Sequence, residues 1–183
     1  VEGFADQVAA ILMAWYPGME GGNALARVLF GDVNPSAKLP LTIPRGPGQL
    51  PAFDPKAREA EYGLFHGYRL LDRQGSEPAF AFGFGLSYTT YAYSNLRLDR
   101  EEVGPEGAVE ASVDITNSGG RAGEEVVQLY VACERSKVER AVKELKGFAR
   151  VALAPGETRT VTLTLPVREL AYWEVEKKGW TVE

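Results

Sequence analysis

Beyond residue 91 the chain alternates between apolar and polar residues with a period of two, and this pattern limits the fold more than any other sequence feature. Alternation of this kind places the apolar side chains on one face of a β-strand. It occurs at residues 109–115, 127–131 and 161–165, with turn sequences at 117–120 and 154–157 between the runs. Several short strands without a helical pattern between them predict an immunoglobulin-like β-sandwich of about 90 residues.

The cysteine content refines this prediction. Cys133 is the only cysteine in the sequence, so the chain lacks the Cys, Trp, Cys spacing that marks antibody domains. A fibronectin type III-like sandwich over residues 91–183 fits better. Cys133 cannot close an intramolecular disulfide, and with one histidine the chain has too few of the usual ligands for a structural zinc site. We therefore expect no metal and no cofactor.

The N-terminal part has a different sequence pattern. Residues 8–15 form a continuous apolar run, which is typical of a strand buried on both faces of a parallel sheet, although a buried helix has the same pattern. A glycine-rich loop and a short helical pattern over residues 24–30 follow, with Asn23 as the expected cap and Gly31 as the expected end. Strand, loop and helix form half of a βαβ unit, so we expect a fragment of an α/β sandwich domain.

Prolines and glycines dominate the connection between the two parts. Residues 34–44 contain three prolines and can form at most a short edge strand. Residues 45–61 are rich in proline, glycine and charge, which is typical of a long surface loop. We expect three regions: the end of an α/β domain with its connector (1–71), an aromatic and glycine-rich linker (72–90), and the sandwich (91–183).

Composition excludes several classes of partner. The 183 residues carry 20 Lys and Arg against 25 Asp and Glu, a net charge of −5, which leaves no electrostatic footprint for nucleic acid. No apolar run approaches the roughly 20 residues of a membrane span. The chain begins with Val-Glu rather than Met and has no signal-like segment, so we expect a piece of a longer protein or one subunit of a split one.

Blocks spread along the whole chain resemble glycoside hydrolase family 3. Residues 14–22 read Ala-Trp-Tyr-Pro-Gly-Met-Glu-Gly-Gly, and residues 29–40 continue the similarity to the end of that family's α/β sandwich domain. Further blocks are Gly-Tyr-Arg at 67–69, Phe-Gly-Phe-Gly-Leu-Ser-Tyr-Thr at 82–89, Gly-Glu-Glu-Val-Val-Gln-Leu-Tyr-Val at 123–131 and Glu-Leu-Lys-Gly-Phe at 144–148. The resemblance implies the multi-domain β-glucosidase and β-xylosidase type.

This resemblance also implies a mechanism and its location. Such enzymes are retaining hydrolases, in which an Asp nucleophile and a Glu acid/base lie about 5 Å apart. In the family pattern both carboxylates precede everything in this chain, so we assign no catalytic residue here. We expect the segment to be a structural, inactive part of a β-glucosidase-like enzyme whose remaining catalytic portion, on the same or a separate chain, binds the β-glucoside.

Four residues are candidates for a position near the substrate: Glu20, Asp54, His66 and Arg69. Each also has a structural interpretation, which we favour. Glu20 could bind the amides at the start of the following helix, and Asp54 could form an Asp-Pro turn. His66 lies among apolar residues and has no nucleophile beside it, and Arg69 could pin a loop by pairing with a carboxylate.

The rings of residues 80–93 suggest an alternative function. They could form a sugar-stacking platform, making the chain a carbohydrate-binding or adhesion module, or they could form an apolar seam between the two parts. We favour the seam. A homodimer is a further expectation, and of the cellular compartments the periplasm or the extracellular space is favoured, although the sequence does not determine the location.

Overall fold

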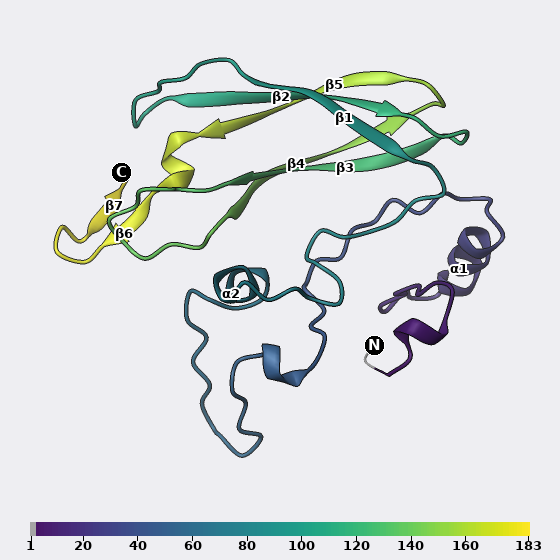
Figure 1. The fold of residues 1–183 in the computed structure, drawn as a ribbon, viewed down its shortest axis with the longest axis horizontal. Coiled ribbons are helices and arrows are strands. Elements are labelled where there is room, and N and C mark those ends of the chain that lie inside the picture. Colours follow the sequence, from purple (N-terminus) through teal and green to yellow (C-terminus); the bar gives the residue numbers. More distant parts are fainter. Residues whose placement is uncertain (1–2) are drawn as a thin grey trace. The chain divides into compact units, whose positions relative to one another are not determined.

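The computed structural model describes residues 3–183 and divides into two units, with the boundary between Tyr88 and Thr89 (Figure 1). The second unit begins at Thr89 and contains all seven strands that residues 3–183 form. The first unit contains both α-helices and no strand among its described residues.

The second unit is a sandwich of two antiparallel layers (Figure 1). One sheet has the strand order β1-β2-β5, and the other pairs β3 with β4. A short hairpin of β6 and β7 follows a 3-10 helix, η3. The mixed fold class, with a fibronectin type III-like sandwich, is confirmed. The elements are β1 (Tyr91–Leu98), β2 (Ala108–Asn117), β3 (Gly123–Val131), β4 (Glu144–Leu153), β5 (Thr158–Pro166), η3 (Val167–Leu170), β6 (Tyr172–Glu174) and β7 (Gly179–Thr181).

The core of the sandwich follows the predicted alternation. Ile115 on β2 is fully buried, and Val127, Val151, Leu153 and Val161 pack around it from β3, β4 and β5. Each of these residues occupies an inward position of its strand, since alternate side chains point to opposite faces. Burial of these apolar side chains against the facing sheet is the main stabilisation of this unit.

Asn117 joins the end of β2 to three other segments. Its side chain is fully buried, and its Oδ1 accepts hydrogen bonds from Thr89 Oγ1 (2.7 Å) and from the Gly119 amide (3.1 Å). Its Nδ2 donates to the carbonyls of Arg121 (2.7 Å) and Leu153 (3.1 Å). The sequence predicted a turn at this position, and the structure shows that the turn is also a polar anchor within the core.

The helix after the glycine-rich loop begins earlier than predicted. Helix α1 spans Gly21–Leu29, and its N-cap is Glu20 rather than Asn23. The Asn23 cap is therefore wrong, because residue 23 already lies inside the first turn. The predicted end is confirmed: Gly31 adopts a φ of +83° and donates its amide to the Val28 carbonyl, as glycine does after many helices.

Residues 8–15 do not form the predicted parallel strand. They carry no strand assignment, and Trp15 has a φ of +52°, which interrupts an extended segment. A parallel strand needs a hydrogen-bonded neighbour, and within residues 3–183 no strand lies beside this run. The apolar run is therefore present without a neighbouring strand in the described part of the chain to which it could hydrogen-bond.

Residues 34–44 and 80–88 lie side by side in the first unit. Ile43 forms an isolated antiparallel bridge with Phe80, so the short edge pairing is confirmed. Leu39 exchanges backbone hydrogen bonds with Phe84 and Gly83, and a side chain at Gly85 would collide with the Ala37 carbonyl. The glycines of the aromatic cluster therefore permit close backbone contact.

The remaining elements of this unit are short. They are η1 (Ala5–Gln7), η2 (Pro47–Gln49) and α2 (Tyr68–Gln74). Helix α2 was not predicted from the sequence, although Gly75 ends it in the left-handed conformation. The loop over residues 51–61 is exposed along its whole length.

Candidate functional site

The four candidate residues lie on exposed or half-buried parts of the first unit. Glu20 is exposed at the start of α1, and its Oε2 accepts a hydrogen bond from Asn23 Nδ2 (2.8 Å). No side-chain hydrogen bond caps the helix. The Glu20 carboxylate therefore does not bind the amides at the start of α1, contrary to the structural interpretation of the sequence. Its negative charge still lies where the helix dipole favours it.

Asp54 and His66 make local contacts. Asp54 Oδ1 accepts the Lys56 amide (2.9 Å), and its carbonyl accepts the Ala57 amide (3.1 Å), which is the geometry of an Asx turn. His66 is exposed, and its Nδ1 lies 3.0 Å from the Gly63 carbonyl. Both side chains stabilise the loop in which they lie.

Arg69 lies in the first turn of α2 and is half-buried. Its guanidinium carbon is 6.0 Å from the centroid of the Tyr68 ring, at the edge of a cation–π contact. The side-chain hydrogen bonds of Glu20, Asp54 and His66 all reach residues of their own local segments, and none of these bonds joins one candidate to another. The nearness of the four residues to a substrate therefore stays a prediction.

The aromatic rings contact one another in pairs. Tyr68 and Phe82 have ring centroids 5.0 Å apart, and Phe80 and Phe84 have centroids 5.6 Å apart. Tyr88 uses its hydroxyl to donate to the Val28 carbonyl (2.8 Å). Pairing of this kind contributes to packing. Because Tyr88 and Tyr93 are 44% and 50% exposed, the sugar-stacking platform stays a prediction.

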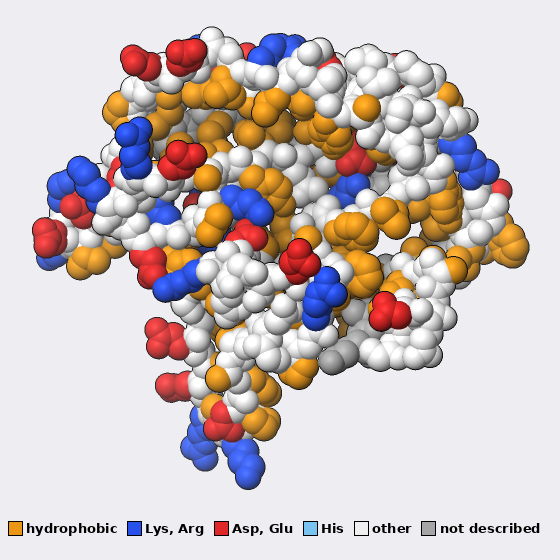
Figure 2. All heavy atoms as spheres, viewed as in Figure 1, with side chains coloured by type: hydrophobic (Ala, Val, Ile, Leu, Met, Phe, Trp, Pro, Cys, Tyr) orange, Lys and Arg blue, Asp and Glu red, His pale blue; other side chains and the backbone are white. Residues whose placement is uncertain are grey.

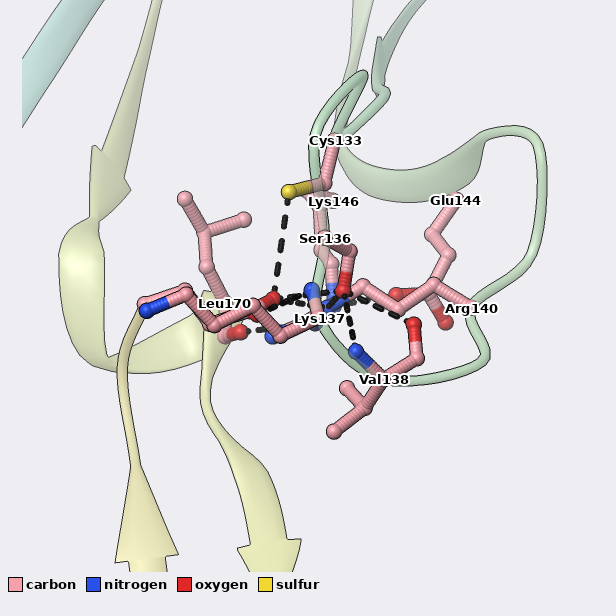
Figure 3. Close-up of polar contacts among 9 residues, drawn as sticks. Cys133, Ser136, Lys137, Val138, Arg140, Glu144, Lys146 and Leu170 are labelled. Carbon is pink, nitrogen blue, oxygen red and sulfur yellow. Dashed lines mark hydrogen bonds and ion pairs between the residues drawn. The ribbon is translucent and has the colours of Figure 1, made fainter.

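The second unit contains a polar cluster that no local sequence pattern predicted (Figure 3). The Glu183 carboxylate accepts hydrogen bonds from Ser136 Oγ (2.6 Å), the Lys137 amide (2.6 Å) and Arg140 Nε (3.1 Å). Arg140 also donates to the Leu170 carbonyl (3.0 Å) and lies over the Tyr172 ring. The hydrogen-bonded partners are 30 to 47 residues apart in sequence, which is why no local motif reveals them.

This cluster holds three segments together: the loop between β3 and β4, the segment around η3 and β6, and the end of the chain. The second unit contains no histidine, so within this unit Ser136 has no imidazole base. A serine nucleophile needs an adjacent base, so we assign the cluster a structural role. Cys133 Sγ lies 4.0 Å from Glu183 and is exposed.

Replacing Glu183 with glutamine tests this role. The Ser136 hydroxyl, the Lys137 amide and Arg140 lower the pKa of the Glu183 carboxyl, so the ionised carboxylate stabilises the fold above its unfolded pKa of about 4.3. We expect E183Q to have a lower melting temperature than the wild type at pH 7, measured by calorimetry. The difference should shrink as the pH falls through the lowered pKa, and a difference independent of pH would contradict this account.

Residues 3–183 contain neither a cluster of metal ligands nor a membrane-spanning helix. No group of three or more His, Cys, Asp or Glu side chains in this range could hold a metal ion. None of its helices is long and apolar enough to cross a bilayer.

Comparison with known proteins places the chain in a family. Residues 1–88 match the domain described as "Glycosyl hydrolase family 3 C-terminal domain", and residues 125–183 match "Fibronectin type III-like domain". This chain belongs to glycoside hydrolase family 3. Its two units correspond to the C-terminal region of the family's β-glucosidases.

Two curated relatives and one solved structure illustrate the similarity. A β-glucosidase of Rhizobium radiobacter is 47% identical over 93% of the chain, and the thermostable β-glucosidase B of Acetivibrio thermocellus is 47% identical over 97%. The crystal structure of a β-glucosidase from Kluyveromyces marxianus in complex with glucose superposes with a TM-score of 0.87 at 40% identity and covers 100% of the chain. The chain spans only 22%, 24% and 22% of these proteins respectively.

Proposed function

We propose that the chain acts as the C-terminal part of a retaining β-glucosidase of glycoside hydrolase family 3. The observation that carries this proposal is its 47% identity to β-glucosidases of which it spans 22% and 24%. The rest of such an enzyme would supply the nucleophile and the acid/base. The role of these two units is to support that catalytic part.

The surface of the first unit supports this proposal. Large apolar side chains are exposed around α1, including Tyr16 (100%), Met19 (101%) and Phe30 (86%). Leu12 and Leu29 are 47% and 67% exposed. Exposed apolar surface of this extent marks an interaction site, and the catalytic portion of the hydrolase is the partner that the family relationship suggests.

Glu20, Asp54, His66 and Arg69 remain our candidates for residues that approach the substrate. Their position on exposed loops and helix ends of the unit with the apolar surface supports this, because binding residues are often carried by loops on a rigid scaffold. They would orient the sugar rather than react with it.

The 183-residue chain alone should therefore not hydrolyse an aryl β-glucoside. We expect the rate of nitrophenol release to equal that of buffer, and the Glu20→Gln variant to give the same rate. Retaining hydrolysis by the chain that is lost in E20Q would place the chemistry in this segment and overturn the proposal.

A further inference from the structure

The connection between η2 and α2 is a long exposed loop. Residues 51–64 are all exposed and form no helix or strand. Among the described residues, this segment takes part in only three hydrogen bonds, two within the turn at 54–57 and one between the Gly63 carbonyl and His66 Nδ1. Exposed segments with few hydrogen bonds open easily and are the positions at which proteases cut folded proteins most readily.

The tip of this loop is strongly charged. Five of the eight residues 54–61 carry a charge: Asp54, Lys56, Arg58, Glu59 and Glu61. Figure 2 shows Lys, Arg, Asp and Glu side chains gathered over this loop, which runs from η2 to α2 in Figure 1. The centres of protein interfaces are depleted of charged residues. We therefore expect the tip to stay in water when a partner covers the apolar surface around α1.

The other basic residues of the first unit lie in ordered structure. Three of them belong to α1 and α2, and two donate side-chain hydrogen bonds to carbonyls of the segment 77–85 (2.9 and 3.2 Å). These residues are Arg27, Arg69 and Arg73 in the helices, and Lys38 and Arg45 outside them. A protease binds its substrate as an extended chain, so these positions become accessible only after local unfolding. Lys56 and Arg58 require only the opening of the exposed turn at 54–57.

Contacts at the base of the loop join the segment before it to the segment after it. Backbone hydrogen bonds between 2.8 and 3.1 Å long link Leu39 and Ile43 to residues 79–84. Closer to the boundary of the unit, Asn34 Oδ1 accepts a hydrogen bond from the Tyr88 amide (2.8 Å). None of these bonds involves the exposed part of the loop, so a cut there leaves them intact.

We propose that Lys56 and Arg58 form a cleavage site for trypsin-like serine endoproteases, and that the cut chain persists as two associated pieces. Such proteases hold the basic side chain before the cut in a specificity pocket that contains an aspartate. Lys56 is the preferred position, because Ala57 follows it. Arg58 is followed by Glu59, whose carboxylate is repelled by the acidic pocket.

The cut is a hydrolysis of one peptide bond. The protease serine attacks the carbonyl carbon of Lys56, the bond to the Ala57 nitrogen breaks, and that nitrogen takes a proton from the protease histidine. Water then hydrolyses the acyl-enzyme. One water molecule is consumed, Lys56 ends in a carboxylate, and Ala57 begins with an amino group.

Digestion of the full chain with a low concentration of trypsin at neutral pH tests this proposal. Mass spectrometry of the denatured digest should show two first products that meet between residues 56 and 57. The native mass should equal that of the uncut chain plus one water. A first cut after any residue other than Lys56 or Arg58 would overturn the proposal, and so would separation of the two products under native conditions.

Two variants show whether the basic side chains direct the cut. The double substitution Lys56→Gln and Arg58→Gln removes both side chains that the protease pocket binds, so we expect the first cut to be at least about tenfold slower. The matched control, Arg135→Gln, changes an exposed basic residue between β3 and β4 and should leave the rate unchanged. A double variant cut as fast as the wild type would contradict the proposal.

An assembled enzyme shows whether the loop stays accessible beside a catalytic part. In the thermostable β-glucosidase B of Acetivibrio thermocellus, the segment that matches this chain would be exchanged for it. We expect trypsin to make the same first cut at a rate within about tenfold of that in the free chain, because the charged tip stays in water. Complete protection of the loop in a folded chimera would show that the catalytic part covers it, contrary to the proposal.

Discussion

Replacing Asn117 with alanine should lower the free energy of unfolding of the sandwich by about 4 kcal/mol. The change removes four hydrogen bonds: those to Thr89 and Leu153 are buried, and those to Gly119 and Arg121 are partly buried. Each buried polar group left unsatisfied costs roughly 1–3 kcal/mol, and partial relaxation reduces the sum. For a domain of about 100 residues this corresponds to a fall in melting temperature of about 20 °C.

Two further variants show whether hydrogen bonding causes the effect. Asn117→Asp keeps the side-chain volume but replaces the donor to two carbonyls with an acceptor, so we expect a loss at least as large as in N117A. Ser118→Ala changes the neighbouring residue, whose hydroxyl makes an exposed contact with Thr90, and should alter stability by less than about 0.5 kcal/mol. The measurement is hydrogen exchange of β2 and β5 amides in the full chain; unchanged protection in N117A would refute this role for Asn117.

The sandwich was predictable because its signal is local. A strand with one buried face repeats every two residues, so β2, β3 and β5 are visible as alternation around Ile115, Val127 and Val161. The alternation does not show which other segment each strand contacts. The polar anchor at Asn117 depends on Leu153, and the cluster around Arg140 depends on Glu183, which lies 43 residues further along the chain.

The α/β part was harder to predict for a different reason. An apolar run such as residues 8–15 indicates burial but not what buries it, and periodicity does not distinguish a buried strand from other buried segments. Leu12 in this run and Leu29 on α1 are both exposed in the structure. The choice of candidate residues depends on the family resemblance and on positions in loops, and neither determines how far a side chain lies from the substrate. These residues are Glu20, Asp54, His66 and Arg69.

A chimera offers a direct way to place the chain in an active enzyme. In the thermostable β-glucosidase B of Acetivibrio thermocellus, the matching 24% would be exchanged for this chain. If Glu20, Asp54, His66 or Arg69 approaches the sugar, replacing it in the chimera should raise KM more than it lowers kcat, because it removes binding without touching the reacting carboxylates. The apolar residues around α1 should become protected from hydrogen exchange as they are covered.

The value of kcat/KM of this chimera for an aryl β-glucoside is the most direct test that the chain serves as the C-terminal part of such an enzyme. We expect kcat/KM of the chimera to lie within about tenfold of the parent value. For the same enzyme with the segment deleted we expect a value at least about 1000-fold lower, because the large rate enhancement of an enzyme depends on an intact active site. A folded chimera as inactive as the deletion would contradict the account.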